Sequence, residues 1–68
     1  MSDVRVRING EEACLPPLSI KQLLDHYGLS GRMIALERNR AIVNRSQYEQ
    51  VHIADGDVIE IVHCVSGG

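Results

Sequence analysis

The 68-residue chain is long enough for one small domain, and its apolar content of 44% lies in the range of globular proteins. Its net charge of −2 and its pI of about 5.8 argue against nucleic-acid binding, because nucleic-acid-binding domains usually carry a basic face. No apolar stretch approaches the roughly 20 residues that a membrane helix requires, and the N-terminus lacks the apolar segment of a signal peptide. We therefore expect a cytoplasmic protein that binds neither nucleic acid nor membrane.

The N-terminal segment predicts a β-hairpin. Residues 4–8 (VRVRI) strictly alternate apolar and polar side chains, as half-buried strands do. Asn9-Gly10 follows at once and is a strong hairpin signal, because both residues tolerate a positive φ. We predict a return strand through residues 12–15, which Pro16-Pro17 ends because proline has no backbone donor for pairing.

A short amphipathic helix should follow the hairpin. Ser19 is a good N-cap, and Gln22 three residues later completes a capping box. Gly28 is a natural residue to end the helix. The predicted apolar face holds Ile20, Leu23, Leu24 and Tyr27. With only about two turns, the helix depends on packing rather than on propensity.

The second half of the chain predicts strands separated by polar turns. In order, we expect a strand at 33–36, a turn at 37–40, a short strand at 41–43, one helical turn within 46–50, a tight turn at 54–57 and a last strand at 58–63. The chain has no Trp or Phe, so the core should be aliphatic. A hairpin, a helix and two or three further strands predict an α+β fold, in which the sheet packs on the helix.

The last strand should separate its side chains between two faces. Ile59 and Ile61 are expected inside, which leaves Val58, Glu60 and Val62 on the opposite face, an apolar patch with one acid. Such a patch is either an ordinary solvent-exposed face or a surface on which a partner docks.

The chain ends on Cys64-Val65-Ser66-Gly67-Gly68. Ordering two glycines costs the most backbone entropy, so this end is either a frayed terminus or a functional group. We expect a domain of residues 1–65 followed by a flexible tail of residues 66–68.

The thiols and histidines predict no metal site. Cys14 and Cys64 form no spaced set and should be free in a reducing compartment. Cys14 is expected to be a small core or edge residue, while Cys64 is either unconstrained or able to link to a partner's thiol. The three histidines are spread along the chain, and Asp55-Gly56-Asp57 lacks the later ligands of a calcium loop.

Four segments together resemble the ThiS family, the sulfur carrier proteins of thiamine biosynthesis. They are Ile8-Asn9-Gly10, Glu37-Arg38-Asn39, Asp55-Gly56-Asp57 and the ending VIEIVH…GG, and the resemblance covers the whole chain. It implies a ubiquitin-like β-grasp fold, with a mixed four- to five-stranded sheet packed on one short helix. The residues themselves indicate only a polar turn at Glu37-Arg38-Asn39, with no binding role.

The resemblance also implies a chemistry. An E1-like, ThiF-type adenylating enzyme would use ATP to convert the Gly68 carboxylate into an acyl-adenylate. A persulfide donor would then supply the sulfur of a thiocarboxylate, which a ThiG-type thiazole synthase would consume. Gly68 would be the reacting residue, with Gly67 and Ser66 giving it access to a narrow site. The chain itself would bind no cofactor, because ATP belongs to the partner enzyme.

Other functions remain open from the sequence. A molybdopterin synthase small subunit or a ubiquitin-like protein modifier would share the fold and the Gly-Gly end. A pure binding module would have glycines that play no part. An enzyme is disfavoured, because the chain has no evident set of nucleophile, base and orienting residue, and little room for a pocket of several hundred Å³. We expect a carrier protein.

Overall fold

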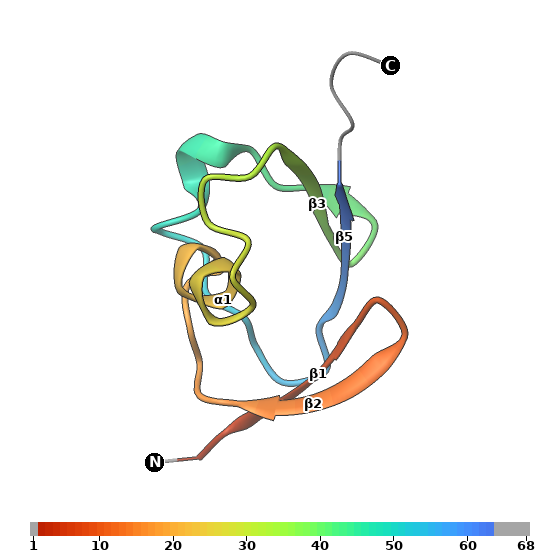
Figure 1. Ribbon diagram of the computed structural model, residues 1–68. Helices are drawn as coiled ribbons and strands as arrows, with labels where there is room; N and C mark the ends of the chain where they lie inside the picture. Colours follow the sequence, from red (N-terminus) through yellow and green to blue (C-terminus); the bar gives the residue numbers. More distant parts are fainter. Residues whose placement is uncertain (1, 64–68) are drawn as a thin grey trace.

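The N-terminal hairpin forms where the alternation predicts it. In the computed structural model, which describes residues 2–63, strand β1 (Val4–Ile8) pairs antiparallel with β2 (Glu11–Leu15), as Figure 1 shows. The φ angles of Asn9 and Gly10 are 49° and 84°, so both residues take the left-handed conformation that a tight hairpin turn requires. The return strand begins one residue earlier than predicted.

Helix α1 (Ile20–His26) begins with the predicted capping box. The Ser19 hydroxyl accepts a hydrogen bond from the backbone N–H of Gln22 at 3.1 Å, and the Ser19 N–H donates to the Gln22 Oε1 at 3.0 Å. These bonds satisfy two backbone donors that a helix start would otherwise leave unpaired. A seven-residue helix is thus fixed at its first turn.

The end of α1 is closed by Gly28, as predicted. Gly28 has a φ of 71°, its N–H donates to the Asp25 carbonyl at 3.1 Å, and the next N–H, of Leu29, donates to the Leu24 carbonyl at 2.8 Å. This bonding pattern is the Schellman motif. The prediction that Tyr27 belongs to the apolar face of the helix was wrong. Tyr27 is the C-cap residue, so its backbone no longer follows the helical repeat, and the residue is 43% exposed.

Three further strands complete the sheet. They are β3 (Ile34–Arg38), β4 (Ala41–Ile42) and β5 (Val58–His63), and the strand order is β2-β1-β5-β3-β4. The β1–β5 pair is parallel and the other pairs are antiparallel, so the sheet is mixed. This arrangement confirms the predicted α+β fold, with five strands and one short helix.

The boundaries around β3 differ from the prediction. Glu37 and Arg38 were expected in a turn, but they pair with Glu60 and Ile59 and belong to the strand. The turn is only Asn39–Arg40, with φ angles of 54° and 70°. The predicted helical turn is the 3₁₀ helix η1 (Arg45–Gln47), which begins one residue earlier than expected. Pairing with β5, which is distant in the sequence, therefore extends β3 through the polar residues Glu37 and Arg38.

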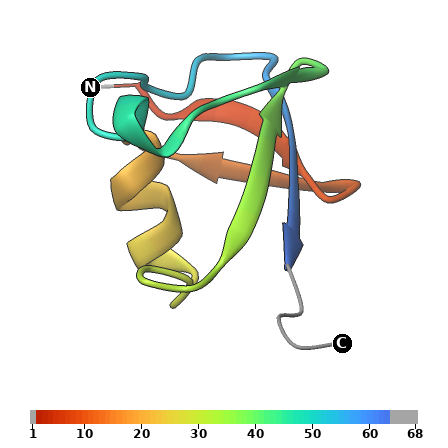
Figure 2. The same cartoon turned by 90° about the horizontal axis from the view of Figure 1, so that it is seen from above.

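The core lies between α1 and one face of the sheet, as Figure 2 shows. It is aliphatic, as the composition predicts, and its buried members are Val6, Ile8, Leu15, Ile20, Leu23, Leu24, Leu36, Val43, Ile53, Ile59 and Ile61. No element within residues 2–63 covers the opposite face of the sheet. Within the same residues, no helix has the length and apolar character needed to cross a membrane.

Candidate functional site

Strand β5 is the central strand of the sheet and leads into the C-terminal residues. Ile59 and Ile61 face the core with 0% and 8% exposure, while Val58 and Val62 on the opposite face are 42% and 59% exposed. Glu60, between the two valines, is also exposed. The predicted separation of the two faces is confirmed. Val58, Glu60 and Val62 therefore lie on the uncovered face, in the strand that precedes the Gly-Gly end.

The start of β5 is held by the carboxylate of Asp57, which is 5% exposed. Its Oδ2 accepts hydrogen bonds from Arg38 Nε and from the Ala54 backbone N–H, both at 2.8 Å, and its Oδ1 accepts one from Asn39 Nδ2 at 3.0 Å. Burial opposes ionisation of Asp57, but the bonds from Arg38, Asn39 and Ala54 outweigh it and lower the pKa below 3.8. Asp57 is thus a charged anchor for the start of β5, because it joins the loop before that strand, at Ala54, to Arg38 at the end of β3.

Asn39 joins the same anchor to the backbone of β5. Its Oδ1 accepts from the Val58 N–H at 2.9 Å, and its own N–H donates to the Val58 carbonyl at 2.7 Å. Sequence reasoning indicated only a turn here, because nothing local links Asn39 to a strand 19 residues further along the chain. The role of Arg38 and Asn39 is to fix the position of β5.

Asn9 holds the other side of β5 beyond the end of β1. Its Nδ2 donates to the Ile61 carbonyl at 3.2 Å, and its Oδ1 accepts from the Ile61 N–H at 2.7 Å. The Asn9 side chain thereby makes the two hydrogen bonds to β5 that the backbone of a neighbouring strand would make. It does so at the point where the hairpin turn carries the chain away from β5. In addition, Asp55 Oδ1 accepts from the Arg5 N–H at 2.8 Å. All three internal segments that carry the family resemblance therefore converge on β5 or on the turn before it.

Several predicted site residues lie outside the described residues. Gly68, Gly67, Ser66 and Cys64 belong to this group, and so does the predicted domain boundary at residues 65 and 66. Cys14 is exposed on the edge strand β2, so the edge placement is confirmed and the core placement was wrong. Residues 2–63 contain no cluster of three or more His, Cys, Asp or Glu side chains that could hold a metal ion.

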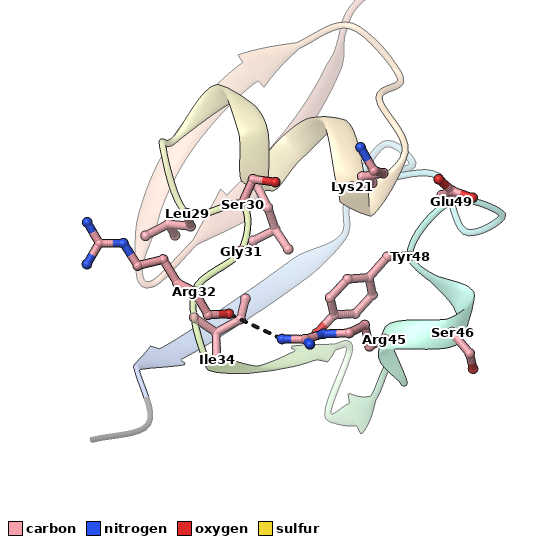
Figure 3. A pocket seen from close by; sticks show the side chains of 11 residues that line it. Lys21, Leu29, Ser30, Gly31, Arg32, Ile34, Arg45, Ser46, Tyr48 and Glu49 are labelled. Carbon is pink, nitrogen blue, oxygen red and sulfur yellow. Dashed lines mark hydrogen bonds between the residues drawn. The ribbon is translucent and has the colours of Figure 1, made fainter. Parts of the chain in front are cut away.

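A cavity of about 410 Å³ lies between α1, the loop after it and η1 (Figure 3). The expectation that the chain has little room for such a pocket was wrong. Its lining includes Leu24, Ile34 and Tyr48. Arg45 crosses it and donates to the Arg32 carbonyl at 3.3 Å, while the Arg32 side chain points away. No His or Cys among the described residues lines it, so it brings no nucleophile and base of those kinds together.

Comparison with known proteins relates the whole chain to one family. The model of the ThiS family matches residues 6–68. The sulfur carrier protein ThiS of Bacillus subtilis (strain 168) is 44% identical over 50 residues, which are 74% of this chain and 76% of the relative. A protein of Paramagnetospirillum magneticum named thiazole synthase is 41% identical over 66 residues; these are 96% of this chain but 20% of that protein.

The fold is also that of a solved structure. The crystal structure of a thiamine biosynthesis protein (ThiS) from Geobacter metallireducens superposes with a TM-score of 0.82, covering 96% of this chain and all of that one. The two sequences are 20% identical, so this likeness shows the fold alone. The match of the family model from β1 to the last glycine, together with the similarity to the Bacillus protein, shows that the chain belongs to the ThiS family.

Proposed function

We propose that the chain is a sulfur carrier of thiamine biosynthesis whose reacting group is the carboxylate of Gly68. The single observation that carries this proposal is the ThiS family match, which runs through both C-terminal glycines. The name of the Bacillus relative, sulfur carrier protein ThiS, supports the same function.

The chemistry starts from a poor electrophile. A carboxylate oxygen of Gly68 attacks the α-phosphorus of ATP in the E1-like adenylating enzyme, and pyrophosphate leaves. The terminal sulfur of a persulfide donor then attacks the acyl carbon and AMP leaves, which forms an acyl disulfide. A thiol cleaves its S–S bond, which releases the thiocarboxylate and forms a new disulfide. The chain contributes its terminus and no catalytic side chain, so the partner enzymes must position the reaction.

The position of β5 limits where these reactions take place. Five residues, 64–68, follow His63, and even a fully extended chain spans at most about 3.6 Å per residue. A segment of five residues therefore reaches at most roughly 18 Å, which bounds the distance between a partner's active site and β5. Gly67 and Gly68 have no Cβ, and Ser66 is small, which suits a narrow active-site channel.

The partners follow from the same chemistry. The adenylating enzyme activates Gly68, the persulfide donor supplies sulfur, and thiazole synthase receives it. In the Paramagnetospirillum protein named thiazole synthase, a segment similar to this chain belongs to the same polypeptide, which supports an association between the two. We place the docking surface for partners on Val58, Glu60 and Val62, because this exposed face directly precedes the reacting terminus.

An intact-mass assay tests the proposal. The chain is incubated with the adenylating enzyme, ATP, a persulfide donor and a thiol, and we expect a mass gain equal to replacing one oxygen by sulfur. Omitting ATP, or deleting Gly68, should abolish the gain. An unchanged mass in the complete mixture would refute the carrier function. Recovery of a molybdopterin synthase large subunit or of lysine-linked adducts in a pull-down would instead favour another β-grasp function.

A further inference from the structure

Asn9 and Gly10 form a dipeptide whose chemistry favours spontaneous deamidation. In this reaction the backbone nitrogen that follows an asparagine attacks the side-chain amide, and a glycine at that position has no side chain to hinder the attack. The chain has three asparagines, of which only Asn9 precedes a glycine, whereas Asn39 and Asn44 each precede an arginine. The sequence therefore singles out Asn9 as the reactive position.

The folded chain holds the Asn9 side chain on β5. Its Nδ2 donates to the Ile61 carbonyl at 3.2 Å, and its Oδ1 accepts from the Ile61 N–H at 2.7 Å. The Asn9 backbone N–H also donates to the Ile59 carbonyl, at 2.9 Å. Both side-chain bonds need a planar amide, but attack on Cγ makes that carbon tetrahedral. Deamidation therefore requires these bonds to break, which couples the reaction to the detachment of β5 from the hairpin turn.

The attacking nitrogen of Gly10, in contrast, is not engaged. Within residues 2–63 its N–H donates no backbone hydrogen bond, and the turn is exposed to water. Asp55-Gly56 could form the same kind of ring, but there the Asp55 Oδ1 accepts from the Arg5 N–H and the Gly56 N–H donates to the Arg5 carbonyl, both at 2.8 Å. Only the side chain of Asn9 thus has to be released for attack, whereas Asp55-Gly56 must lose the bonds of both reacting groups.

We propose that Asn9 is a modification site, which deamidates through a succinimide when β5 detaches and whose product no longer holds β5. Hydroxide removes the proton of the Gly10 nitrogen, which attacks the Asn9 Cγ. The new C–N bond closes the succinimide ring, and Nδ2 takes a proton from water and leaves as ammonia. Water then opens the ring. Opening at Cγ gives aspartate, and opening at the main-chain carbonyl of residue 9 gives isoaspartate, in which the main chain runs through the former side chain.

Neither product restores the two bonds to Ile61. In the aspartate, one oxygen can still accept from the Ile61 N–H, but the other takes the place of Nδ2 and faces the Ile61 carbonyl, so that two acceptors meet. In the isoaspartate, an extra main-chain carbon lengthens the turn between β1 and β2 and moves the carboxylate. Because Ile61 lies near the end of β5 at His63, either product weakens the hold on the strand that leads to Gly68.

Incubation of the full chain in warm, mildly alkaline buffer tests the reactivity. Peptide mapping by mass spectrometry locates a mass gain equal to replacing NH by oxygen, and protein isoaspartyl methyltransferase detects isoaspartate. In urea that unfolds the chain, we expect Asn9 to react faster than Asn44, which is exposed and precedes an arginine. In native buffer, Asn9 should react at least roughly tenfold more slowly than in urea, because the reaction waits for local opening. Equal rates at the two asparagines in urea, or at Asn9 in the two buffers, would overturn the proposal.

Two variants test whether β5 controls the reaction. Ile61→Val keeps the backbone groups that bond to Asn9 but weakens the packing of β5, whereas Ser19→Ala removes the cap of α1 at a similar cost in stability. In native buffer, Ile61→Val should accelerate deamidation several-fold more than Ser19→Ala does. Equal acceleration would mean that only global unfolding exposes Asn9, which would overturn the coupling to β5.

The modified chain itself tests the effect on the fold. Deamidation adds one negative charge, so ion-exchange chromatography separates modified from unmodified chain after the same incubation. The chain modified at Asn9 should melt a few degrees below the unmodified chain. Asn44→Asp adds the same charge outside β5 and the hairpin, so it should change the melting temperature less. A modified chain that melts together with the unmodified chain would overturn the claim that deamidation weakens the hold on β5.

Discussion

Exchanging Asp57 for asparagine tests the anchor of β5 with almost no change of shape. Both carboxylate oxygens of Asp57 accept hydrogen bonds: Oδ1 from Asn39, and Oδ2 from Arg38 and Ala54. An amide must place its NH₂ group against at least one of these donors. Asn39 cannot compensate by turning over, because its own Oδ1 accepts from the Val58 N–H at 2.9 Å. The variant therefore loses at least one hydrogen bond and the negative charge, and its NH₂ group faces a donor with which it cannot form a hydrogen bond.

The expected cost of Asp57→Asn is about 2 kcal/mol. A lost hydrogen bond to a charged group costs roughly 1.5–3 kcal/mol, and a buried donor left unpaired costs about 1–3 kcal/mol, with overlap between the two. The Arg38 side chain is 34% exposed, so water can replace part of its bond to Asp57. This keeps the total cost of the substitution low within these ranges. A domain of this size is stable by roughly 3–10 kcal/mol, so urea denaturation of the isolated chain should detect the change clearly.

Asp55→Asn is the matched control. It makes the same chemical change two residues away, but Asp55 uses one oxygen, Oδ1, to accept from the Arg5 N–H at 2.8 Å. An amide oxygen can keep that bond, so the free energy of unfolding should fall by less than about 0.5 kcal/mol. Equal costs for Asp57→Asn and Asp55→Asn would refute the reasoning that two-sided acceptance at Asp57 anchors β5.

Further predictions concern the other side-chain hydrogen bonds, the helix cap and the turn at Arg40. Asn9→Ala should lower the free energy of unfolding by about 1–3 kcal/mol in urea, because two backbone groups of β5 lose their partner; an unchanged midpoint would contradict this. Ser19→Ala should cost about 1 kcal/mol by the loss of the N-cap, measured in the same way, and Ser19→Gly should cost less. Arg40→Gly should stabilise the chain or leave it unchanged, because glycine adopts the φ of 70° without strain; a lower melting temperature would argue against strain at that turn. The lowered pKa of Asp57 contributes stability that is full above pH 3.8 and is lost as the pH falls through the lower folded-state value, so the acid side of the wild-type stability curve should be steeper than that of Asp57→Asn.

Short-range signals predicted most of the fold. The Asn9-Gly10 turn, the Ser19 cap and the Gly28 stop each act within a few residues, and each is present as expected. Because a period of two places alternate side chains on opposite faces, the burial of Ile59 and Ile61 also followed from local sequence. These features needed no knowledge of which strands are neighbours.

Long-range contacts account for what the sequence did not reveal. Asn9 and Ile61 are 52 positions apart, and Asn39 and Asp57 are 18 apart, so no local pattern pairs them. Glu37 looked like a turn residue because it is polar, and only its pairing with Glu60 extends β3 through it. The same pairing places two exposed carboxylates opposite each other on the uncovered face of the sheet. The exposure of Val58, Glu60 and Val62 was therefore predicted from β5 alone, but the position of Glu37 beside them required the register of the sheet.

Locating the transferred sulfur by fragmentation mass spectrometry tests the central claim most directly. After reaction with the adenylating enzyme, ATP, a persulfide donor and a thiol, we predict that one sulfur replaces one oxygen in the fragment that ends at Gly68, with both cysteines unmodified. A sulfur added to Cys64 or Cys14 as a persulfide, with the Gly68 carboxylate unchanged, would contradict the account.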